Sequence, residues 1–260
     1  MTPPPPESAS PPPTASEADH RLAVDLAEDA GRMLLALREE LEGQGSATLK
    51  REGDRRSHEL LMARLATDAP GDAVLSEEGV DGSARLAAAR TWIIDPLDGT
   101  REYSEPPRGD WAVHVALVAG GQPIAGAVAL PAQNITLSTA TPAPMPADPP
   151  ARPRVIVSRS RPPAVALAVA DALGADLVEM GSAGAKVAAV VLGAADVYAH
   201  AGGQYEWDSC APVAVAAAAG LHTSRIDGVP LLYNTPDPWL PDLLVCHPSL
   251  TEAILAVTRG

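Results

Sequence analysis

The segment WIIDPLDGTREY, Trp92 to Tyr103, constrains this chain most strongly, because it places two carboxylates three residues apart at the end of an apolar run. Residues 91–94 have the β-branched and aromatic content of a short buried strand. Pro96 has no backbone donor and disfavours helix at the preceding residue, so we expect the strand to end and the chain to turn at Asp95. Such a turn lets both carboxylates and the Leu97 carbonyl converge on one point.

This arrangement of oxygen atoms predicts a site for a metal ion and a phosphate. Asp95 and Asp98 are hard ligands that suit Mg²⁺. Gly99 allows the backbone to approach a ligand, and Thr100 supplies a hydroxyl where a helix could begin, a position suited to an oxyanion. A solvated turn, in which Asp98 or Thr100 caps a helix, explains the motif equally well. The motif alone leaves both interpretations open.

Three further acidic sites lie at the ends of predicted elements. They are Glu77 with Glu78 after the apolar stretch 73–75, Asp208 before a predicted buried helix over 211–219, and Asp54 before a predicted helix over 55–66. Each has a simple explanation as surface charge or as a helix cap. Together with the Asp-Pro motif, they favour a single acidic site.

The order of these motifs is Asp54, SEE over 76–78, DPLDGT over 95–100 and WDSCA over 207–211. This order resembles the signature of the lithium-sensitive, Mg²⁺-dependent phosphomonoesterase superfamily, which includes inositol monophosphatases and fructose-1,6-bisphosphatases. The similarity spans most of the chain beyond its amino-terminal tail. It implies a layered α/β fold with alternating α-β-α-β-α layers, a metal site in the cleft between two halves, and inhibition by Li⁺.

Within the superfamily, the chain is most similar to the CysQ-type 3′(2′),5′-bisphosphate nucleotidases. The supporting segments are REY over 101–103, VSRSR over 157–161 and GSAGAK over 181–186. The resemblance implies hydrolysis of the 3′-phosphate of adenosine 3′,5′-bisphosphate to AMP and phosphate. Inositol monophosphatase or fructose-1,6-bisphosphatase activity stays an alternative, because those enzymes use the same metal centre. A non-catalytic nucleotide-binding relative would have little reason to keep so costly a cluster of like charges.

The resemblance also implies a role for each residue of the site. Two Mg²⁺ ions, with a third weaker ion as an option, would bind Glu77, Asp95, the Leu97 carbonyl, Asp98 and Asp208. The catalytic residues would be Asp54 and Thr100, which activate the attacking water, together with Glu77. The substrate would contact Gly99, Thr100, Ser158, Arg159, Ser182 and Lys186. Lys186 is the candidate for the 5′-phosphate, and Glu78 would support the metal ligands.

Other polar residues near these motifs receive no catalytic role. His114 alternates with apolar neighbours and is interpreted as a strand histidine whose hydrogen bonds are satisfied. Arg101 either binds phosphate or pairs with a nearby acid, and His200 and Tyr205 could line the cleft. Two features depart from the family pattern: Cys210 replaces an alanine, and GSAGAK is longer than the GS-x-x-K form of some CysQ-type proteins.

Composition limits the partners and the compartment. A formal charge of −14 and a pI near 4.7 argue against a nucleic-acid polymer as partner. Bound Mg²⁺ would reverse the local charge for a small phosphorylated substrate. No apolar run of about eighteen residues is present, so we expect no membrane partner. The two cysteines and the absence of a secretory signal favour a cytoplasmic enzyme with reduced thiols, and a homodimer stays open.

The chain is predicted to have a tail and two halves. Residues 1–15 form a disordered Pro-rich tail, 16–140 an N-terminal α+β subdomain with most metal ligands, and 154–260 a C-terminal α/β subdomain. Further helices are expected over 16–43, 162–173 and 183–192. Strands are expected over 92–95, 111–118, 124–130, 135–139, 154–158 and 176–179.

Overall fold

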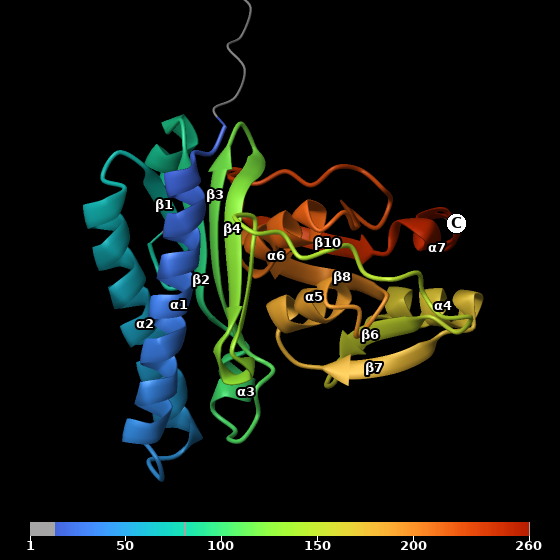
Figure 1. Ribbon diagram of the computed structural model, residues 1–260, viewed down its shortest axis with the longest axis horizontal. Coiled ribbons are helices and arrows are strands. Elements are labelled where there is room, and N and C mark those ends of the chain that lie inside the picture. Colours follow the sequence, from blue (N-terminus) through green and yellow to red (C-terminus); the bar gives the residue numbers. More distant parts are fainter. Residues whose placement is uncertain (1–13, 81, 260) are drawn as a thin grey trace, which may run out of the picture.

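The computed structural model describes residues 14–80 and 82–259, so most of the predicted Pro-rich tail lies outside the described residues. Two five-stranded sheets alternate with three layers of helices (Figure 1). No helix in the described part of the chain is long and apolar enough to cross a membrane.

The first half contains one sheet and the helices that cover its outer face. In chain order its elements are α1 (Glu17–Glu40), α2 (Ser46–Asp68), β1 (Ala73–Ser76), η1 (Ser83–Ala87), β2 (Thr91–Asp98), α3 (Thr100–Tyr103), β3 (Ala112–Ala119), β4 (Gln122–Leu130), η2 (Pro131–Gln133) and β5 (Ile135–Ser138). The strand order is β1-β2-β3-β4-β5. β1 and β2 are parallel, and the remaining neighbours are antiparallel.

The second half contains the other sheet. Its elements are β6 (Arg154–Ser158), α4 (Ala164–Leu173), β7 (Asp176–Met180), α5 (Ala183–Val191), β8 (Val197–Tyr205), α6 (Glu206–Ala218), β9 (His222–Ser224), β10 (Trp239–Cys246), η3 (Pro248–Leu250) and α7 (Thr251–Thr258). The strand order is β7-β6-β8-β10-β9. β6 is parallel to β7 and β8, whereas β10 is antiparallel to β8 and β9.

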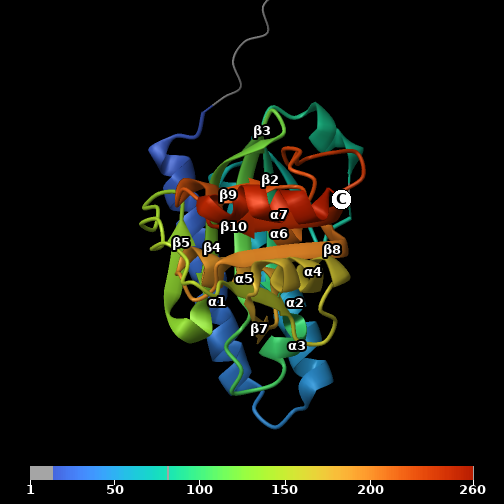
Figure 2. The same ribbon diagram turned by 90° about the vertical axis from the view of Figure 1, so that its right-hand side faces the viewer.

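Burial of apolar faces explains the layers. One hydrophobic cluster lies between the α1/α2 layer and the first sheet, a second joins both sheets through α5 and α6, and a third lies beneath α4 and α7. Figure 2 shows α4 and α7 on the outer face of the second sheet. The predicted α-β-α-β-α arrangement is therefore confirmed.

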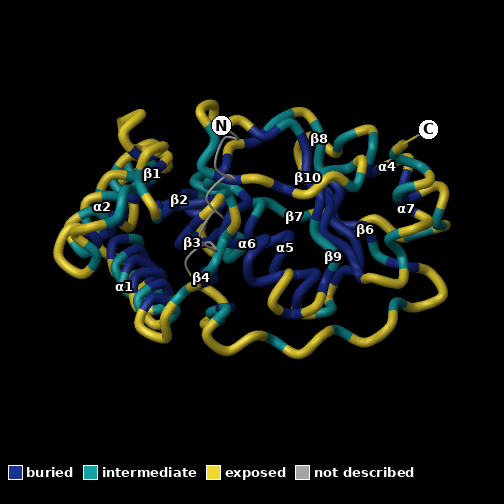
Figure 3. The backbone as a smooth tube through the Cα atoms, turned by 90° about the horizontal axis from the view of Figure 1, so that it is seen from above, coloured by how far each residue is buried: buried dark blue, intermediate teal, exposed yellow. Residues whose placement is uncertain are grey.

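Helix α1 shows how the sequence directs this packing. Ser16 caps the helix and exchanges hydrogen bonds with Asp19, so the two residues form a capping box. Leu26, Leu34 and Leu37 recur at helical spacing and are buried against the first sheet. The inner face of α1 is accordingly buried while its outer face is exposed (Figure 3).

The predicted end of the strand at Pro96 is wrong, because β2 continues through Pro96 to Asp98. Its pairing with β3 is irregular between Asp95, which is opposite His114, and Asp98, which is opposite Ala112. A bulge releases residues from the hydrogen-bond ladder, and so the missing donor of a proline is tolerated there. The bulge still achieves what the turn was expected to achieve, because it brings both carboxylates into one site.

Several other boundaries also differ from the predictions. Helix α2 begins at Ser46, so Asp54 lies inside the helix and not ahead of it. Helix α6 begins at Glu206, so Asp208 is its third residue and not its N-cap, although its carboxylate accepts the backbone N–H of Tyr205 as part of a capping box. Strands β8, β9 and β10 and helix α7 were not predicted.

Candidate active site

Three carboxylates meet between the two sheets. Asp95 and Asp98 come from the bulge of β2, and Asp208 comes from the first turn of α6. One oxygen of each side chain lies within 4.8 Å of the others. The backbone N–H of Tyr205 donates to Asp208 at 2.7 Å and orients that carboxylate. The fold therefore collects acids that are far apart in the sequence.

Burial and mutual repulsion disfavour negative charge in this cluster. Burial, with the charge of Glu77 next in importance, raises the pKa of Asp95 well above its usual value. Burial and then the charge of Asp98 raise the pKa of Asp208 to about 6. Glu77 lies at the exposed rim, but partial desolvation and the neighbouring acids still raise its pKa to about 7. Protein cations alone do not neutralise this site.

Asp98 behaves differently from the other acids, because the start of α5 and His114 compensate its charge. The Ser182 hydroxyl and the backbone N–H of Gly184 donate to one oxygen, and the N–H of Ala183 donates to the other at 3.1 Å. Although burial opposes the charge, His114 and these hydrogen bonds lower the pKa of Asp98 to about 2. Asp98 therefore links the first sheet to the first turn of α5.

His114 was interpreted as a purely structural histidine, and this interpretation is incomplete. The residue is buried in β3 as expected, and its Nδ1 lies 3.0 Å from the Trp207 carbonyl. Its Nε2, however, lies 3.2 Å from a carboxylate oxygen of Asp98. Although burial lowers the pKa of His114, the carboxylate of Asp98 raises it above its usual value overall. His114 thus belongs to the electrostatics of the site.

Asp54 and Thr100 form a second polar group beside the carboxylates. The Thr100 hydroxyl lies 3.2 Å from Asp54 and 3.1 Å from the Leu97 carbonyl, and it can donate to either oxygen. Burial and the charge of Glu78 raise the pKa of Asp54 to about 6. At neutral pH, Asp54 is mostly ionised and can still accept a proton readily.

Gly99 is packed closely against Ser182 at the start of α5. Its φ of 83° falls in the left-handed region, and a Cβ there would lie 2.9 Å from the Ser182 Cβ. Any other residue would be strained and would push α5 away from Asp98. Gly99 therefore allows the two halves to approach closely beside the carboxylates.

The donor set fits hard divalent cations. Asp95, Asp98 and Asp208 supply clustered carboxylate oxygens, and the Leu97 carbonyl and Glu77 lie next to them. Mg²⁺ prefers such oxygens, and its charge would relieve the repulsion that raises these pKa values. Glu77 is the one predicted carboxylate ligand outside the closest cluster among the described residues.

A cleft of about 430 Å³ opens beside the acids and reaches into the second half. Ser158, Ser182 and Lys186 line it together with Asp98 and Asp208. Lys186 is buried, donates to the Ser182 carbonyl at 2.7 Å, and lies over the Tyr198 ring at 5.2 Å. Burial lowers its pKa despite the nearby carboxylates. An anionic ligand would stabilise the charge of this lysine.

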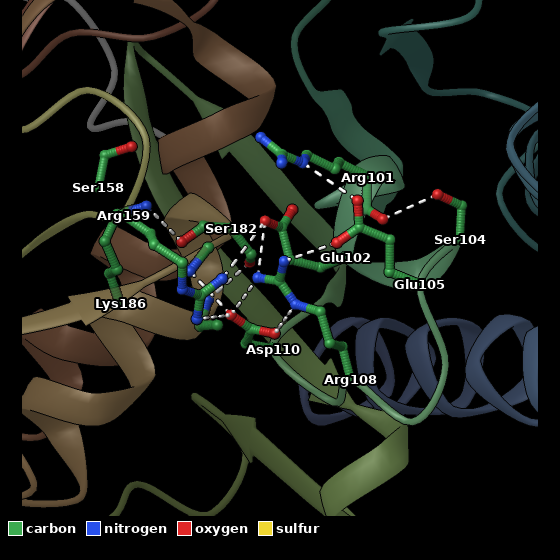
Figure 4. Close-up of polar contacts among 12 residues, drawn as sticks. Arg101, Glu102, Ser104, Glu105, Arg108, Asp110, Ser158, Arg159, Ser182 and Lys186 are labelled. Carbon is green, nitrogen blue, oxygen red and sulfur yellow. Dashed lines mark hydrogen bonds and ion pairs between the residues drawn. The ribbon is translucent and has the colours of Figure 1, made fainter. Parts of the chain in front are cut away.

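Arginines surround a second recess of about 280 Å³, which shares Ser158, Ser182 and Lys186 with the cleft. Arg159 and Arg108 both donate to Asp110 at 2.9 Å (Figure 4). The same carboxylate accepts the backbone N–H of Gly181, immediately before α5, at 2.8 Å. Asp110 therefore joins Arg159 to the segment that holds Asp98.

Sequence reasoning missed several residues of this recess. Asp110, Glu102 and Arg108 form an ion-pair network there, but each looks like ordinary surface charge in the sequence. Arg101 points to Glu105 at 3.3 Å, which favours the ion-pair alternative for it. The side chain of Glu78 is exposed and acts on the site through its charge near Asp54.

Comparison with known families now identifies the chain. The model of the inositol monophosphatase family matches residues 17–146 and 151–259. The chain belongs to the inositol monophosphatase family. The expectation drawn from the order of the motifs is thus confirmed, and the acidic cluster lies in a family whose members are metal-dependent.

Several curated relatives of this chain are named as phosphatases or bisphosphate nucleotidases. The 3′-phosphoadenosine 5′-phosphate phosphatase of Mycobacterium tuberculosis (strain CDC 1551 / Oshkosh) is 51% identical over 235 residues, covering 87% of this chain and 88% of the relative. The protein with the same name from Mycobacterium leprae (strain TN) is 47% identical over 257 residues, covering 94% and 95%. The 3′(2′),5′-bisphosphate nucleotidase CysQ of Escherichia coli (strain K12) is 33% identical, covering 72% and 80%.

Solved structures of the family agree with the fold. CysQ from Bacteroides thetaiotaomicron superposes with a TM-score of 0.76 at 28% identity, covering 89% of this chain and 97% of the other. Inositol monophosphatase II from Staphylococcus aureus gives a TM-score of 0.78 at 18% identity, covering 92% and 95%, and so shows the fold alone.

Proposed function

We propose that this protein is a Mg²⁺-dependent phosphomonoesterase that hydrolyses the 3′-phosphate of adenosine 3′,5′-bisphosphate and releases AMP and phosphate. The observation behind the proposal is the pairing of the Asp95–Asp98–Asp208 cluster with a cationic recess next to it. A substrate with two phosphates needs two anion sites. The names of the relatives at 47–51% identity support the same substrate.

The two anion sites would bind different phosphates. The 3′-phosphate would lie against the carboxylate cluster and the N–H groups of Gly99 and Thr100 at the start of α3. The 5′-phosphate would enter the recess, where Lys186 and Arg159 offer positive charge. Ser182 lines both the cleft and the recess, and its hydroxyl donates to Asp98. An inositol monophosphate would leave the recess without an anion.

Residues of this chain can carry out the proton transfer that the reaction requires. Divalent cations held by Glu77, Asp95, Leu97, Asp98 and Asp208 would stabilise the phosphate charge and make water a better nucleophile. Thr100 would orient the attacking water, and Asp54 would take its proton. The water oxygen bonds to phosphorus as the bond to the 3′-oxygen breaks, and the 3′-oxygen regains a proton from solvent.

A phosphate-release assay on three substrates tests this proposal. We expect kcat/KM for adenosine 3′,5′-bisphosphate to exceed the values for inositol 1-phosphate and fructose 1,6-bisphosphate by about 100-fold or more, since the recess binds a second phosphate at a fixed distance. Each rate should vanish with EDTA and return with Mg²⁺. Preference for inositol 1-phosphate would overturn the substrate, and metal-independent release would overturn the mechanism.

A further inference from the structure

An exposed aromatic pair lies at the mouth of the cleft. Tyr205 ends β8, Trp239 begins β10, and the two residues are directly paired in the antiparallel ladder. Directly opposite residues place their side chains close together on the same face of a sheet. Tyr205 is 46% exposed and Trp239 is 47% exposed. Both line the cleft that also contains Asp98, Asp208 and Lys186.

Neighbouring groups fix both rings in place. Tyr205 stacks on Trp207 with ring centroids 4.7 Å apart and planes 10° apart, so one face of the tyrosine is covered and the other is available. The indole of Trp239 lies against Gly203, where a Cβ would approach its Nε1 to 2.6 Å. Gly203 also has a φ of 94°, so glycine suits both the backbone and the packing. Rings held in this way lose little freedom when a ligand stacks on them.

We propose that Tyr205 and Trp239 form a stacking platform for the nucleobase of the substrate. This inference rests on the proposed function and assigns the part of the cleft that distinguishes a nucleotide from other phosphate esters. A nucleobase offers a flat π face to aromatic rings. Inositol and fructose are saturated and offer none.

The position of the platform agrees with the shape of the substrate. The cleft and the recess share Ser182 and Lys186, so the acids, the cationic recess and the aromatic pair surround a common centre. A ribose at this centre would direct its 3′-phosphate, its 5′-phosphate and its base into three different regions. Each region then has the chemistry that its group needs.

Steady-state kinetics on two substrates that differ only in the base test the platform. The substrates are adenosine 3′,5′-bisphosphate and ribose 3,5-bisphosphate. We expect Tyr205→Ala and Trp239→Ala each to raise KM for the nucleotide about tenfold, which equals about 1.4 kcal/mol, with kcat changed less than about twofold. KM for the base-free substrate should change less than about twofold.

Matched variants separate stacking from general damage. Tyr205→Phe keeps the ring and should behave as the wild type. Leu177→Ala removes an exposed apolar side chain on β7, away from the cleft, and should alter neither KM. Equal increases in KM for both substrates, or no increase for either, would overturn the platform.

A binding measurement tests the platform independently of turnover. AMP should quench the tryptophan fluorescence of the wild type, and Trp239→Phe should lose most of that quenching, while ribose 5-phosphate should cause little. If the wild type binds AMP in this way but does not hydrolyse the bisphosphate, the proposed function fails and the platform stands. If AMP titrates the wild type and Tyr205→Ala identically, the platform fails.

Discussion

The two halves of the molecule contribute opposite chemistry to one site. The first half supplies most of the acids, namely Asp54, Glu77, Asp95 and Asp98, and the second half supplies Asp208 together with Lys186, Arg159, Tyr205 and Trp239. The acids lie on a buried strand and its neighbours, whereas the recognition groups lie at the ends of strands and on the first turn of α5. The comparison indicates that reaction and recognition are separated by element, so they can be altered separately.

Asp98 is the exception, because it belongs to both halves. It lies on β2 but accepts hydrogen bonds from Ser182, Ala183 and Gly184. Asp208 accepts a hydrogen bond from the nearby Tyr205 backbone. Two carboxylates of one cluster therefore differ in how much structure depends on them.

The largest effect is expected from Asp208→Asn. This change keeps the shape of the side chain but removes a charge that we assign to metal binding. We therefore expect kcat/KM to fall by more than about 100-fold. That loss exceeds the one usually caused by removing a group that only supports a metal ligand. The melting temperature without metal should stay equal or rise, because repulsion in the cluster falls.

Asp98→Asn sharpens the same comparison. Activity should fall as far as for Asp208→Asn, but stability should also fall by about 1–3 kcal/mol, because the amide faces donors that the carboxylate satisfied. Urea denaturation of both variants measures the difference. Equal stabilities would show that Asp98 does not hold the halves together.

Lys186→Met should have the next largest effect. We expect KM for adenosine 3′,5′-bisphosphate to rise about 10- to 100-fold, because a buried cation facing the 5′-phosphate is lost. KM for adenosine 3′-monophosphate should change little. Arg21→Gln, an exposed cation on α1, is the control and should leave both values unchanged. An equal rise in KM for both substrates would contradict the assignment of Lys186 to the 5′-phosphate.

A series of melting temperatures measured at different pH values without divalent cations should show how far the acidic cluster lowers stability. The folded-state pKa values of Asp54 and Asp208 are raised to about 6, and that of Glu77 to about 7. Groups with raised pKa values bind protons more tightly when folded, so the stability they provide is lost as pH rises from about 4 to 7. The melting temperature in EDTA should fall by roughly 5 °C between pH 5 and pH 8.

The pKa of Asp98 is shifted in the opposite direction, downwards. The stability that Asp98 contributes is therefore lost only as the pH falls below about 4, outside the range of this series. Mg²⁺ should raise the melting temperature more at pH 8 than at pH 5, because the ligands are then ionised. A metal-free melting temperature that rises with pH would contradict the raised pKa values.

The smallest effect is expected at Ser16, which lies in the α1 layer. Ser16→Ala removes the capping box with Asp19 and should cost about 1 kcal/mol of unfolding free energy. Because this cap belongs to the scaffold of the first half, kcat and KM should not change. Thermal and urea denaturation, with kinetics on the same preparations, measure both.

Local patterns made much of the fold predictable. Strands over 111–118 and 124–130 were predicted and correspond to β3 and β4, and Gly120 and Gly121, both with positive φ, form the turn of their hairpin. Strand β8 was missed because Gly202 and Gly203 interrupt its pattern. The passage of β2 through Pro96 depends on a bulge opposite β3, which no local signal reveals.

Some residues of the candidate site could likewise be predicted from local motifs, and others could not. Asp95, Asp98 and Asp208 belong to distinctive motifs, so their convergence could be expected. Asp110 and Trp239 could not be assigned, because their positions depend on strand register and on how the second sheet packs against the first. Acid motifs are visible in a sequence, but recognition surfaces are assembled by tertiary structure.

Diffraction at the manganese edge from a crystal soaked in Mn²⁺ tests the central claim most directly. We predict anomalous peaks bounded by Asp95, Asp98 and Asp208, with Glu77 and the Leu97 carbonyl as further ligands. Absence of any peak within about 2.5 Å of these oxygens, at saturating Mn²⁺, would contradict the account.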